Sequence, residues 1–115
     1  MKNKYHNTKV IYNGIKFDSI KEKNRYLILK DMERQKLIKE LELQKKFELQ
    51  ESFYYEGKKQ RAIHYIADFF YYDNKLKCYV AEDVKSKITQ KDKVYRLKSK
   101  IFMYQYPNIK FKEVL

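Results

Sequence analysis

The strongest constraint on the fold lies between residues 61 and 85, where two stretches with the composition of β-strands are joined by a short turn. The stretches 61–72 and 76–85 are rich in β-branched and aromatic residues, and Asp73-Asn74-Lys75 supplies turn-forming residues between them. Apolar and polar residues also alternate over 47–55, ahead of a predicted hairpin loop at 56–59. The pattern therefore predicts a three-stranded antiparallel meander.

A helix is predicted before this meander, after a tight turn at Asn13-Gly14. Ser19 and Glu22 have the spacing of a capping box, in which the serine accepts from a backbone amide and the glutamate reaches back to the cap. Good helix formers continue to about Lys36 without Gly or Pro. The apolar residues available for burial on this helix are Ile28, Leu29 and Met32.

A second helix is predicted after the meander, over about 90–106, with Thr89 as its cap and Pro107 beyond its end. Its expected apolar face consists of Val94, Leu97, Ile101 and Tyr104. Alternation over 109–114 predicts a short last strand. The expected order is helix, three strands, helix, strand, which is an α+β fold with a mixed sheet flanked by helices.

Length and composition exclude several classes of protein. A chain of 115 residues suits one domain, here 1–115. The single cysteine, Cys78, cannot form an internal disulfide. The chain has only two histidines, His6 and His64, so one cysteine and two distant histidines exclude a zinc site. No apolar stretch is long enough to cross a membrane, and the first ten residues lack a signal-peptide core. We therefore expect a cytoplasmic protein without a membrane partner, in the host cytoplasm if a phage encodes it.

The charge of the chain suits a polyanionic partner. Lys and Arg number 27 against 15 Asp and Glu, a net charge of +12, and residues 57–115 contribute +8 of it. Between 85 and 100 seven basic residues are opposed only by Asp92. Nucleic-acid binding is therefore expected here. Beside Lys85, the candidate residues are Lys87, Lys91, Lys93, Arg96, Lys98 and Lys100.

Carboxylates interrupt the two apolar strands at corresponding places. Asp68 lies in the first and Glu82-Asp83 in the second, with Lys85 two residues after Asp83. A two-residue loop would pair Asp68 with Ala81 and a four-residue loop would pair it with Asp83, and both put Asp68, Asp83 and Lys85 on one face. A three-residue loop would bring Glu82 to that face instead.

Two carboxylates and an ammonium on one face are the groups that metal-assisted phosphodiester hydrolysis requires. Carboxylates bind Mg²⁺, which polarises the phosphate and acidifies a water, and the lysine can orient that water. The structural alternative is an ion pair buried in the sheet, between Asp83 and Lys85 or Lys87.

These segments resemble the D…(D/E)-x-K signature of the PD-(D/E)XK nuclease superfamily, and the predicted order of elements resembles its αβββαβ restriction-endonuclease-like core. More closely, the chain resembles a small phage and prophage family of that superfamily, whose members are related to Holliday junction resolvases. The matching segments are 13–19 with Glu22, Leu41-Glu42-Leu43-Gln44, 65–69, Glu82-Asp83-Val84-Lys85 and Thr89. Together they cover roughly 12–114.

The resemblance implies roles for four residues. Asp68 and Asp83 would be metal ligands for Mg²⁺ or Mn²⁺, Lys85 the catalytic lysine, and Glu22 a helix carboxylate that reaches the metal directly or through water. The capping box explains Glu22 equally well, so its role stays open. Two departures from the family pattern are Ser86, where relatives commonly have Gly, and Lys45, where a Pro often follows the Gln. Gln44, His64, Tyr95 and Lys98 are weaker site candidates.

The leading interpretation is therefore a metal-dependent DNA endonuclease selective for branched structures, with a role in DNA recombination or genome processing in a phage or prophage. A homodimer would supply the paired cuts that a four-way junction requires. Two alternatives remain: a catalytically degenerate nucleic-acid-binding module of a mobile element, and a protein whose basic surface docks an acidic protein partner. Whether the substrate is DNA or RNA is open from the sequence.

Overall fold

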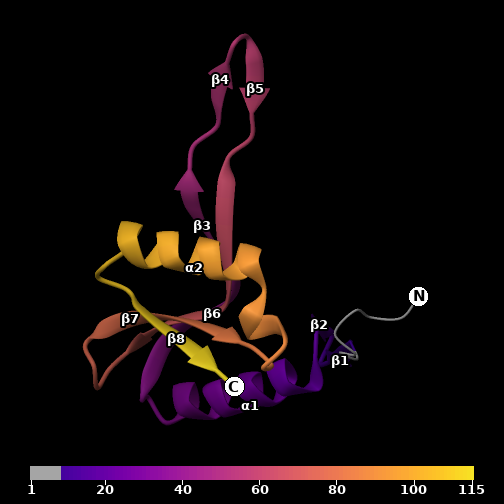
Figure 1. Ribbon diagram of the computed structural model, residues 1–115. Helices are drawn as coiled ribbons and strands as arrows, with labels where there is room; N and C mark the ends of the chain where they lie inside the picture. Colours follow the sequence, from indigo (N-terminus) through magenta and orange to yellow (C-terminus); the bar gives the residue numbers. More distant parts are fainter. Residues whose placement is uncertain (1–8) are drawn as a thin grey trace.

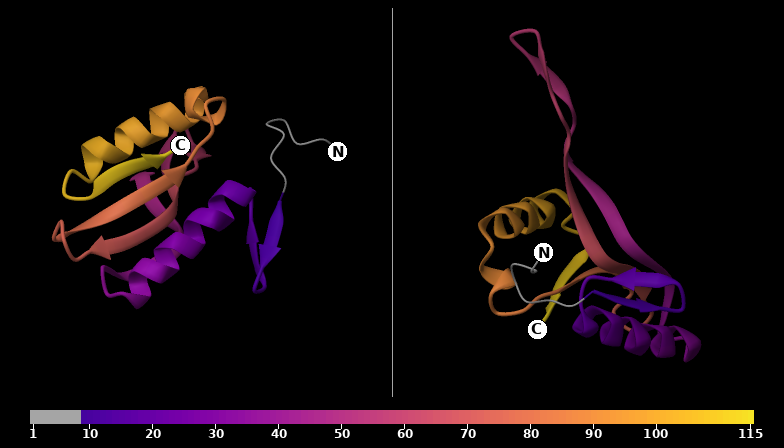
Figure 2. Two further views of the ribbon diagram at one scale, coloured as in Figure 1. Left: turned by 90° about the horizontal axis from the view of Figure 1, so that it is seen from below. Right: turned by 90° about the vertical axis from the view of Figure 1, so that its right-hand side faces the viewer.

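The computed structural model describes residues 9–115, which form an α+β fold around a four-stranded mixed sheet with a helix on each face (Figures 1 and 2). The predicted order of helix, three strands, helix and strand is confirmed, whereas residues 1–8, with His6, lie outside the described part. The main elements are α1 (Ile20–Arg34), β3 (Ile38–Gln50), β6 (Ile63–Asp73), β7 (Cys78–Val84), a 3-10 turn η1 (Thr89–Lys91), α2 (Lys93–Gln105) and β8 (Lys110–Val114). Two small hairpins are made by β1 (Val10–Tyr12) with β2 (Ile15–Phe17), and by β4 (Phe53–Tyr55) with β5 (Lys58–Gln60).

The sheet order is β3-β6-β7-β8, with β6 antiparallel to both of its neighbours and β8 parallel to β7. Four residues, 74–77, connect β6 to β7, and the register pairs Phe69 with Glu82 and Phe70 with Ala81. One further step along this register sets Asp68 opposite Asp83. The four-residue alternative for the loop is therefore the one that the structure adopts.

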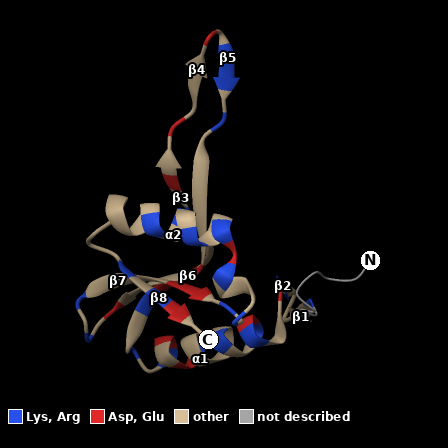
Figure 3. Ribbon diagram, in the orientation of Figure 1, with Lys and Arg blue, Asp and Glu red and all other residues tan. Residues whose placement is uncertain are grey.

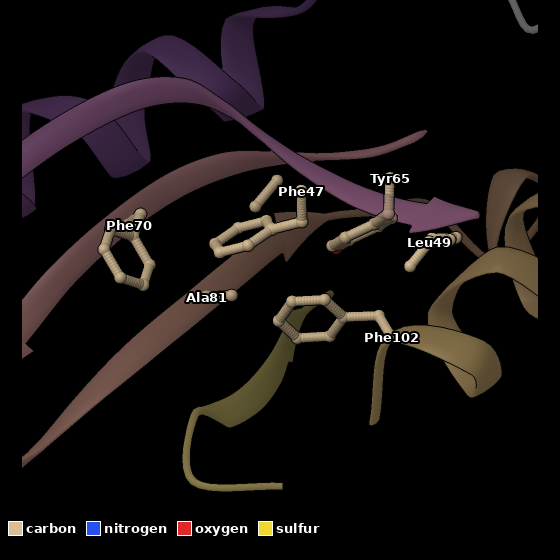
Figure 4. Close-up of a cluster of buried hydrophobic side chains, with 7 residues drawn as sticks. Phe47, Leu49, Tyr65, Phe70, Ala81 and Phe102 are labelled. Atoms are coloured by element: carbon tan, nitrogen blue, oxygen red, sulfur yellow. The ribbon is translucent and has the colours of Figure 1, made fainter. Parts of the chain in front are cut away.

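A cluster of buried side chains lies on each face of the sheet. Under α2, Phe102 packs against Phe47 and Tyr65, with ring centroids 4.8 and 4.9 Å apart (Figure 4). Under α1, Leu29 packs in a second cluster with Phe17, Ile38, Phe69, Tyr71 and Val80. Because both helices are fixed to the same sheet, their N-terminal turns are held beside the end of β7.

The alternation of side chains along strand β6 changes at Asp68. Tyr65 and Ala67 belong to the cluster under α2, whereas Phe69 and Tyr71 belong to the cluster under α1, although all four have the same parity in the strand. Phe70 lies in the same cluster as Ala67, so the regular alternation of the strand is broken between Ala67 and Phe69. The break lies at Asp68, opposite Gln44 of β3, which has a positive φ.

Helix α1 begins where the sequence predicts, but only part of its predicted apolar stripe is buried. The Ser19 hydroxyl caps the helix by accepting from the Glu22 amide at 3.1 Å. Leu29 is buried and Met32 is half-buried, whereas Ile28 is exposed. The buried face instead passes through Glu22 and Leu29, seven residues apart, which is two turns of helix.

Helix α2 differs from its prediction in its start and its buried face. Asp92 is the cap, accepting from the Tyr95 amide at 2.9 Å, while Thr89 bonds with Ser86 in the preceding turn. Of the predicted apolar face only Ile101 packs against the core, and Val94, Leu97 and Tyr104 are exposed. The buried face is instead made by Ser99 and Phe102, with Tyr95 and Tyr106 partly buried against the same cluster.

The strands also differ from the prediction at their ends. The first strand of the meander begins at Ile38 rather than at residue 47, and the third begins at Cys78 rather than at 76. The predicted hairpin loop at 56–59 tightens to Glu56-Gly57, both with positive φ, the backbone that a two-residue hairpin turn favours. Asn13-Gly14 makes the same kind of turn, as predicted. Within residues 9–115, no helix has the length and apolar character that a membrane crossing demands.

Candidate active site

Asp68 and Asp83 lie side by side where β6 and β7 end their pairing. The Asp68 carboxylate accepts a hydrogen bond from the Val84 amide at 2.8 Å, which ties it across to the neighbouring strand. Each carboxyl group also interacts electrostatically with the other. The two aspartates therefore lie on neighbouring strands and close together, as the sequence predicts.

Lys85, the first residue beyond β7, lies against Asp83. Its ammonium is 3.2 Å from the buried Asp83 carboxylate and 4.1 Å from the centre of the Tyr95 ring. The Tyr65 hydroxyl donates to the other oxygen of Asp83. Two side chains from β6 and α2 thus hold the acid and the lysine in fixed positions relative to each other.

Glu82 faces the opposite side of the sheet and has different partners. Arg25 of α1 binds both of its oxygens, at 2.8 and 2.7 Å, and the Tyr71 hydroxyl donates to it as well. Glu82 is completely buried, so this paired arrangement satisfies a charge that would otherwise be costly in the core. Of the two neighbouring acids, Asp83 is the one beside Asp68.

Glu22 brings a third carboxylate to this place. Its backbone amide takes part in the cap with Ser19, while its side chain accepts from the Gln44 side-chain amide at 3.3 Å. The same Gln44 amide lies 3.4 Å from the second oxygen of Asp68. The capping prediction is thus confirmed for Ser19, and the Glu22 carboxylate is directed to the site.

The carboxylates of the site ionise with difficulty. Burial, and then the negative charge of Asp68, raises the pKa of Glu22 to about 8. Burial and the charge of Asp83 raise the pKa of Asp68 to about 7, and burial raises the pKa of Asp83 as well. A positive charge placed among these groups would stabilise their ionised forms.

Solvent reaches the acids from two hollows, and Asp68 and Lys85 line both. The smaller, about 170 Å³, lies against the start of α1 and is lined by Ser19, Lys21 and Glu22 among others. The larger, about 360 Å³, lies against α2 and η1, where its lining residues are His64, Tyr65, Ile66, Asp83, Thr89, Asp92, Val94, Tyr95 and Lys98. The site therefore sits in a cleft between the N-terminal turns of the two helices.

The chemistry of the donor set, though not its present arrangement, suits a divalent cation of the Mg²⁺ or Mn²⁺ type. Carboxylate oxygens are the ligands these ions prefer, and Glu22, Asp68 and Asp83 provide them in one acidic cluster with raised pKa values. Across residues 9–115, however, no group of three or more His, Cys, Asp or Glu side chains is placed so that it could hold a metal ion. A fit therefore requires water or phosphate oxygens among the ligands, as Mg²⁺ commonly has.

The predicted basic residues do not form one surface. Lys98 lines the hollow that contains Asp83, whereas Lys93, Arg96 and Lys100 line a different hollow of about 590 Å³, between α2 and β8. Lys87 and Lys91 are exposed in the connection before α2. Figure 3 shows the positions of the basic residues, in blue, along α2 and the segment before it.

Two residues of the site were not found from the sequence. Lys21 donates to the Lys85 carbonyl at 3.0 Å. The feature of the sequence that could have identified Lys21 is its position next to Glu22 in the first turn of the helix. Tyr65 carried no signal, because regular alternation places it on the face opposite to Asp68. The break in the alternation of β6 at Asp68 reverses that expectation.

The comparisons with known proteins identify a family. Residues 2–115 match the family described as Protein of unknown function (DUF1064). The chain belongs to this family. No curated protein and no solved structure matches it.

Proposed function

We propose that this DUF1064 protein is a Mg²⁺- or Mn²⁺-dependent endonuclease of the PD-(D/E)XK type that hydrolyses DNA. The observation that carries the proposal is the meeting of Asp68, Asp83 and Lys85 in one cleft with Glu22 from α1. The order of the elements, α1, β3, β6, β7, α2 and β8, supports it as well, since the resemblance implies the same order.

Each residue of the site has a part in the proposed reaction. Asp68, Asp83 and Glu22 would hold the cation. When bound, the cation supplies Lewis-acid polarisation of a phosphate oxygen and lowers the pKa of a water. Lys85, fixed by Asp83 and the Tyr95 ring, can donate to the attacking water or to the charge that develops on the phosphate. Hydrolysis joins the water oxygen to phosphorus and breaks one ester bond to the sugar.

The proposed substrate is branched DNA of phage or prophage recombination, in the host cytoplasm. One chain carries one such cleft, and resolving a four-way junction requires a cut on each of two strands. A two-fold symmetric homodimer would supply both cuts. The net charge of +12 supports a polyanionic substrate.

A second candidate function is binding without cleavage, as a module of a mobile element. The observation that favours it is the ion pair of Asp83 with Lys85, together with the Tyr65 hydroxyl, which occupies the oxygens of one proposed ligand. Under this proposal the same cleft and the basic residues hold nucleic acid, and the carboxylates serve only the structure.

The test is a cleavage assay on labelled four-way junctions, flaps and linear duplexes, each in Mg²⁺, Mn²⁺ or EDTA. The endonuclease proposal predicts metal-dependent products that EDTA abolishes and that Asp83→Asn no longer makes. Binding to these substrates with no product under any condition would support the second candidate. Junctions and duplexes cut equally well by a strict monomer in light scattering would remove the preference for branched DNA but leave the nuclease.

A further inference from the structure

A projecting hairpin, residues 51–62, extends far beyond the sheet and both helices (Figures 1 and 2). We call it the arm; it contains β4, β5 and the Glu56-Gly57 turn. Its three consecutive aromatic residues Phe53, Tyr54 and Tyr55 are 41, 72 and 64% exposed. From the sequence, the alternating aromatic residues of this region could form part of the core or an interface. Phe47 lies in the buried cluster under α2, whereas Phe53, Tyr54 and Tyr55 do not.

The arm presents an aromatic ring and a cation on each of its two faces. The register pairs Tyr55 with Lys58 and Tyr54 with Lys59. Directly opposed residues share a face and successive residues alternate, so Tyr55 and Lys58 lie on one side and Tyr54 and Lys59 on the other. Exposed aromatic rings beside lysines are the side chains that stack on bases and contact phosphates in single-stranded nucleic acid.

The end of β3, from which the arm begins, is bound by the end of α2. The Gln105 side-chain amide donates to the Leu49 carbonyl at 2.6 Å, and the Tyr106 hydroxyl donates to the Glu48 carbonyl at 2.8 Å. The strands that lead into the arm, β3 and β6, also carry Gln44 and Asp68. The arm therefore begins from the same two strands that carry residues of the acidic cleft.

The reach of the arm matches the dimensions of duplex DNA. Ten residues separate Asp68 from Lys58 along the chain, and strands rise about 3.3 Å per residue, so Lys58 lies at most roughly 33 Å from the cleft. One turn of B-DNA is about 34 Å long. When the backbone of a nucleic acid lies at the cleft, a nucleotide about one helical turn away can thus reach the tip of the arm.

Charge favours an anionic partner over a second copy of the chain. The arm contributes Lys58, Lys59 and Arg61 against Glu51 and Glu56, and Figure 3 shows the basic residues along β5. The arm of a second copy would bring the same three basic residues to this place, where like charges repel, so the proposed homodimer would form through another surface. A two-stranded hairpin is also only marginally stable in water by itself, which fits a segment that is completed by a ligand.

We infer that the arm is a second nucleic-acid-binding site, in which Tyr54 and Tyr55 stack on unpaired bases and Lys58 and Lys59 contact the flanking phosphates. The inference deepens the proposed function, because it names unpaired bases at a branch point as the feature that is recognised. It also holds for a protein that binds without cutting, so the two can be tested separately.

The test measures the affinity of full-length protein for a labelled four-way junction, a single strand and a fully paired duplex by fluorescence anisotropy in EDTA. The double variant Tyr54→Ala/Tyr55→Ala should bind the junction and the single strand at least tenfold more weakly, and the duplex less affected. Tyr54→Phe/Tyr55→Phe should restore binding, because stacking needs the ring and not the hydroxyl. Tyr104→Ala, at an 87% exposed tyrosine on α2, is the matched control and should change nothing.

The lysines give an independent measurement. Lys58→Gln/Lys59→Gln should reduce the slope of log affinity against log salt by about 1.4, from two single-strand phosphate contacts at roughly 0.7 each. Circular dichroism and thermal melting should be unchanged, since the arm lies outside both buried clusters. Unchanged affinity in both double variants would overturn the inference, as would a loss of dimer in light scattering that accounts for the weaker binding. Arm-dependent binding without cleavage by the wild type would refute the nuclease alone.

Discussion

Gln44 faces Asp68 across β3 and β6, and its side-chain amide also lies within 3.3 Å of the Glu22 carboxylate. A positive φ at Gln44, 53°, accompanies this position within the strand. One neutral donor thus joins two acids that come from a helix and a strand. Hydrogen-bond donors around proposed metal ligands orient them before a metal binds.

Gln44→Ala should therefore weaken Mg²⁺ or Mn²⁺ binding by about 10- to 100-fold, the usual effect of removing a residue that orients metal ligands. Isothermal titration calorimetry measures it directly. Gln50→Ala, an exposed glutamine at the end of the same strand, is the control and should bind metal as the wild type does. Equal affinities for the two variants would mean that Gln44 has no part in the site.

Asp83→Asn and Glu82→Gln should have different effects, the first on metal binding and cleavage and the second on stability. Asp83→Asn is expected to abolish metal binding and cleavage, while Glu82→Gln should keep more activity and lose stability, on the order of 3 kcal/mol, because Arg25 loses its buried partner. Urea unfolding and the cleavage assay on the same preparations measure both properties. If Glu82→Gln proves the less active of the two, the assignment of Asp83 is wrong.

Glu22→Gln tests whether the helix carboxylate has a role beyond the cap. Gln serves as well as Glu in a capping box, and the amide of residue 22 still donates to Ser19, so we expect the fold to be kept and turnover to fall at least a hundredfold. Ser19→Ala should show the reverse, a loss of about 1 kcal/mol in unfolding free energy with turnover nearly intact. Small effects on turnover in both variants would assign Glu22 to the cap alone.

The stability of the metal-free protein should depend on pH through the same carboxylates. Glu22 and Asp68 have a pKa of about 8 and about 7 in the folded protein, above their ordinary values of 4.5 and 3.8. Between the ordinary and the raised pKa values, the folded state therefore binds more protons than the unfolded state. The stability of the folded state is greatest below the ordinary values and falls as the pH rises to about 8.

Urea unfolding in EDTA from pH 5 to pH 8 measures this decline, and Glu22→Gln provides the comparison because it cannot ionise. The variant should gain stability relative to the wild type as the pH rises. Mg²⁺ at pH 8 should recover part of the loss in the wild type only. Parallel pH profiles for the two proteins would show that Glu22 ionises normally.

The fold could be predicted because its signals are local and strong. The turn at 73–75, the alternation of 61–72 and the capping serine at Ser19 each act over a few residues, and they predict the elements and their order. The proximity of Asp68 and Asp83 also follows, since it depends only on parity and loop length. The catalytic roles remain predictions.

The features that could not be predicted depend on packing over longer distances. Helix α2 has two apolar stripes, and periodicity alone does not reveal that Phe102 rather than Leu97 fills the space above Phe47. The contact of Tyr65 with Asp83 requires the break in the alternation of β6 at Asp68. The position of Gln44 beside Glu22 and Asp68 depends on a strand that begins at Ile38. It also depends on a positive φ at Gln44, which is rare in strands.

Substitutions of basic residues on α2 should show which hollow carries the scissile phosphate. Lys98 lines the hollow of Asp83 and Lys85, whereas Lys100, two residues further along the same helix, lines the hollow between α2 and β8. Lys98→Gln should therefore lower kcat/KM for junction cleavage by about tenfold and Lys100→Gln by less than threefold, since one charge-assisted contact to phosphate contributes roughly 1.5–3 kcal/mol when it is made and nothing when it is not. Single-turnover cleavage rates of the two variants at one salt concentration measure the difference. A larger loss with Lys100→Gln would place the DNA along the outer side of α2, away from the acidic cleft, and would contradict the proposed orientation of the substrate.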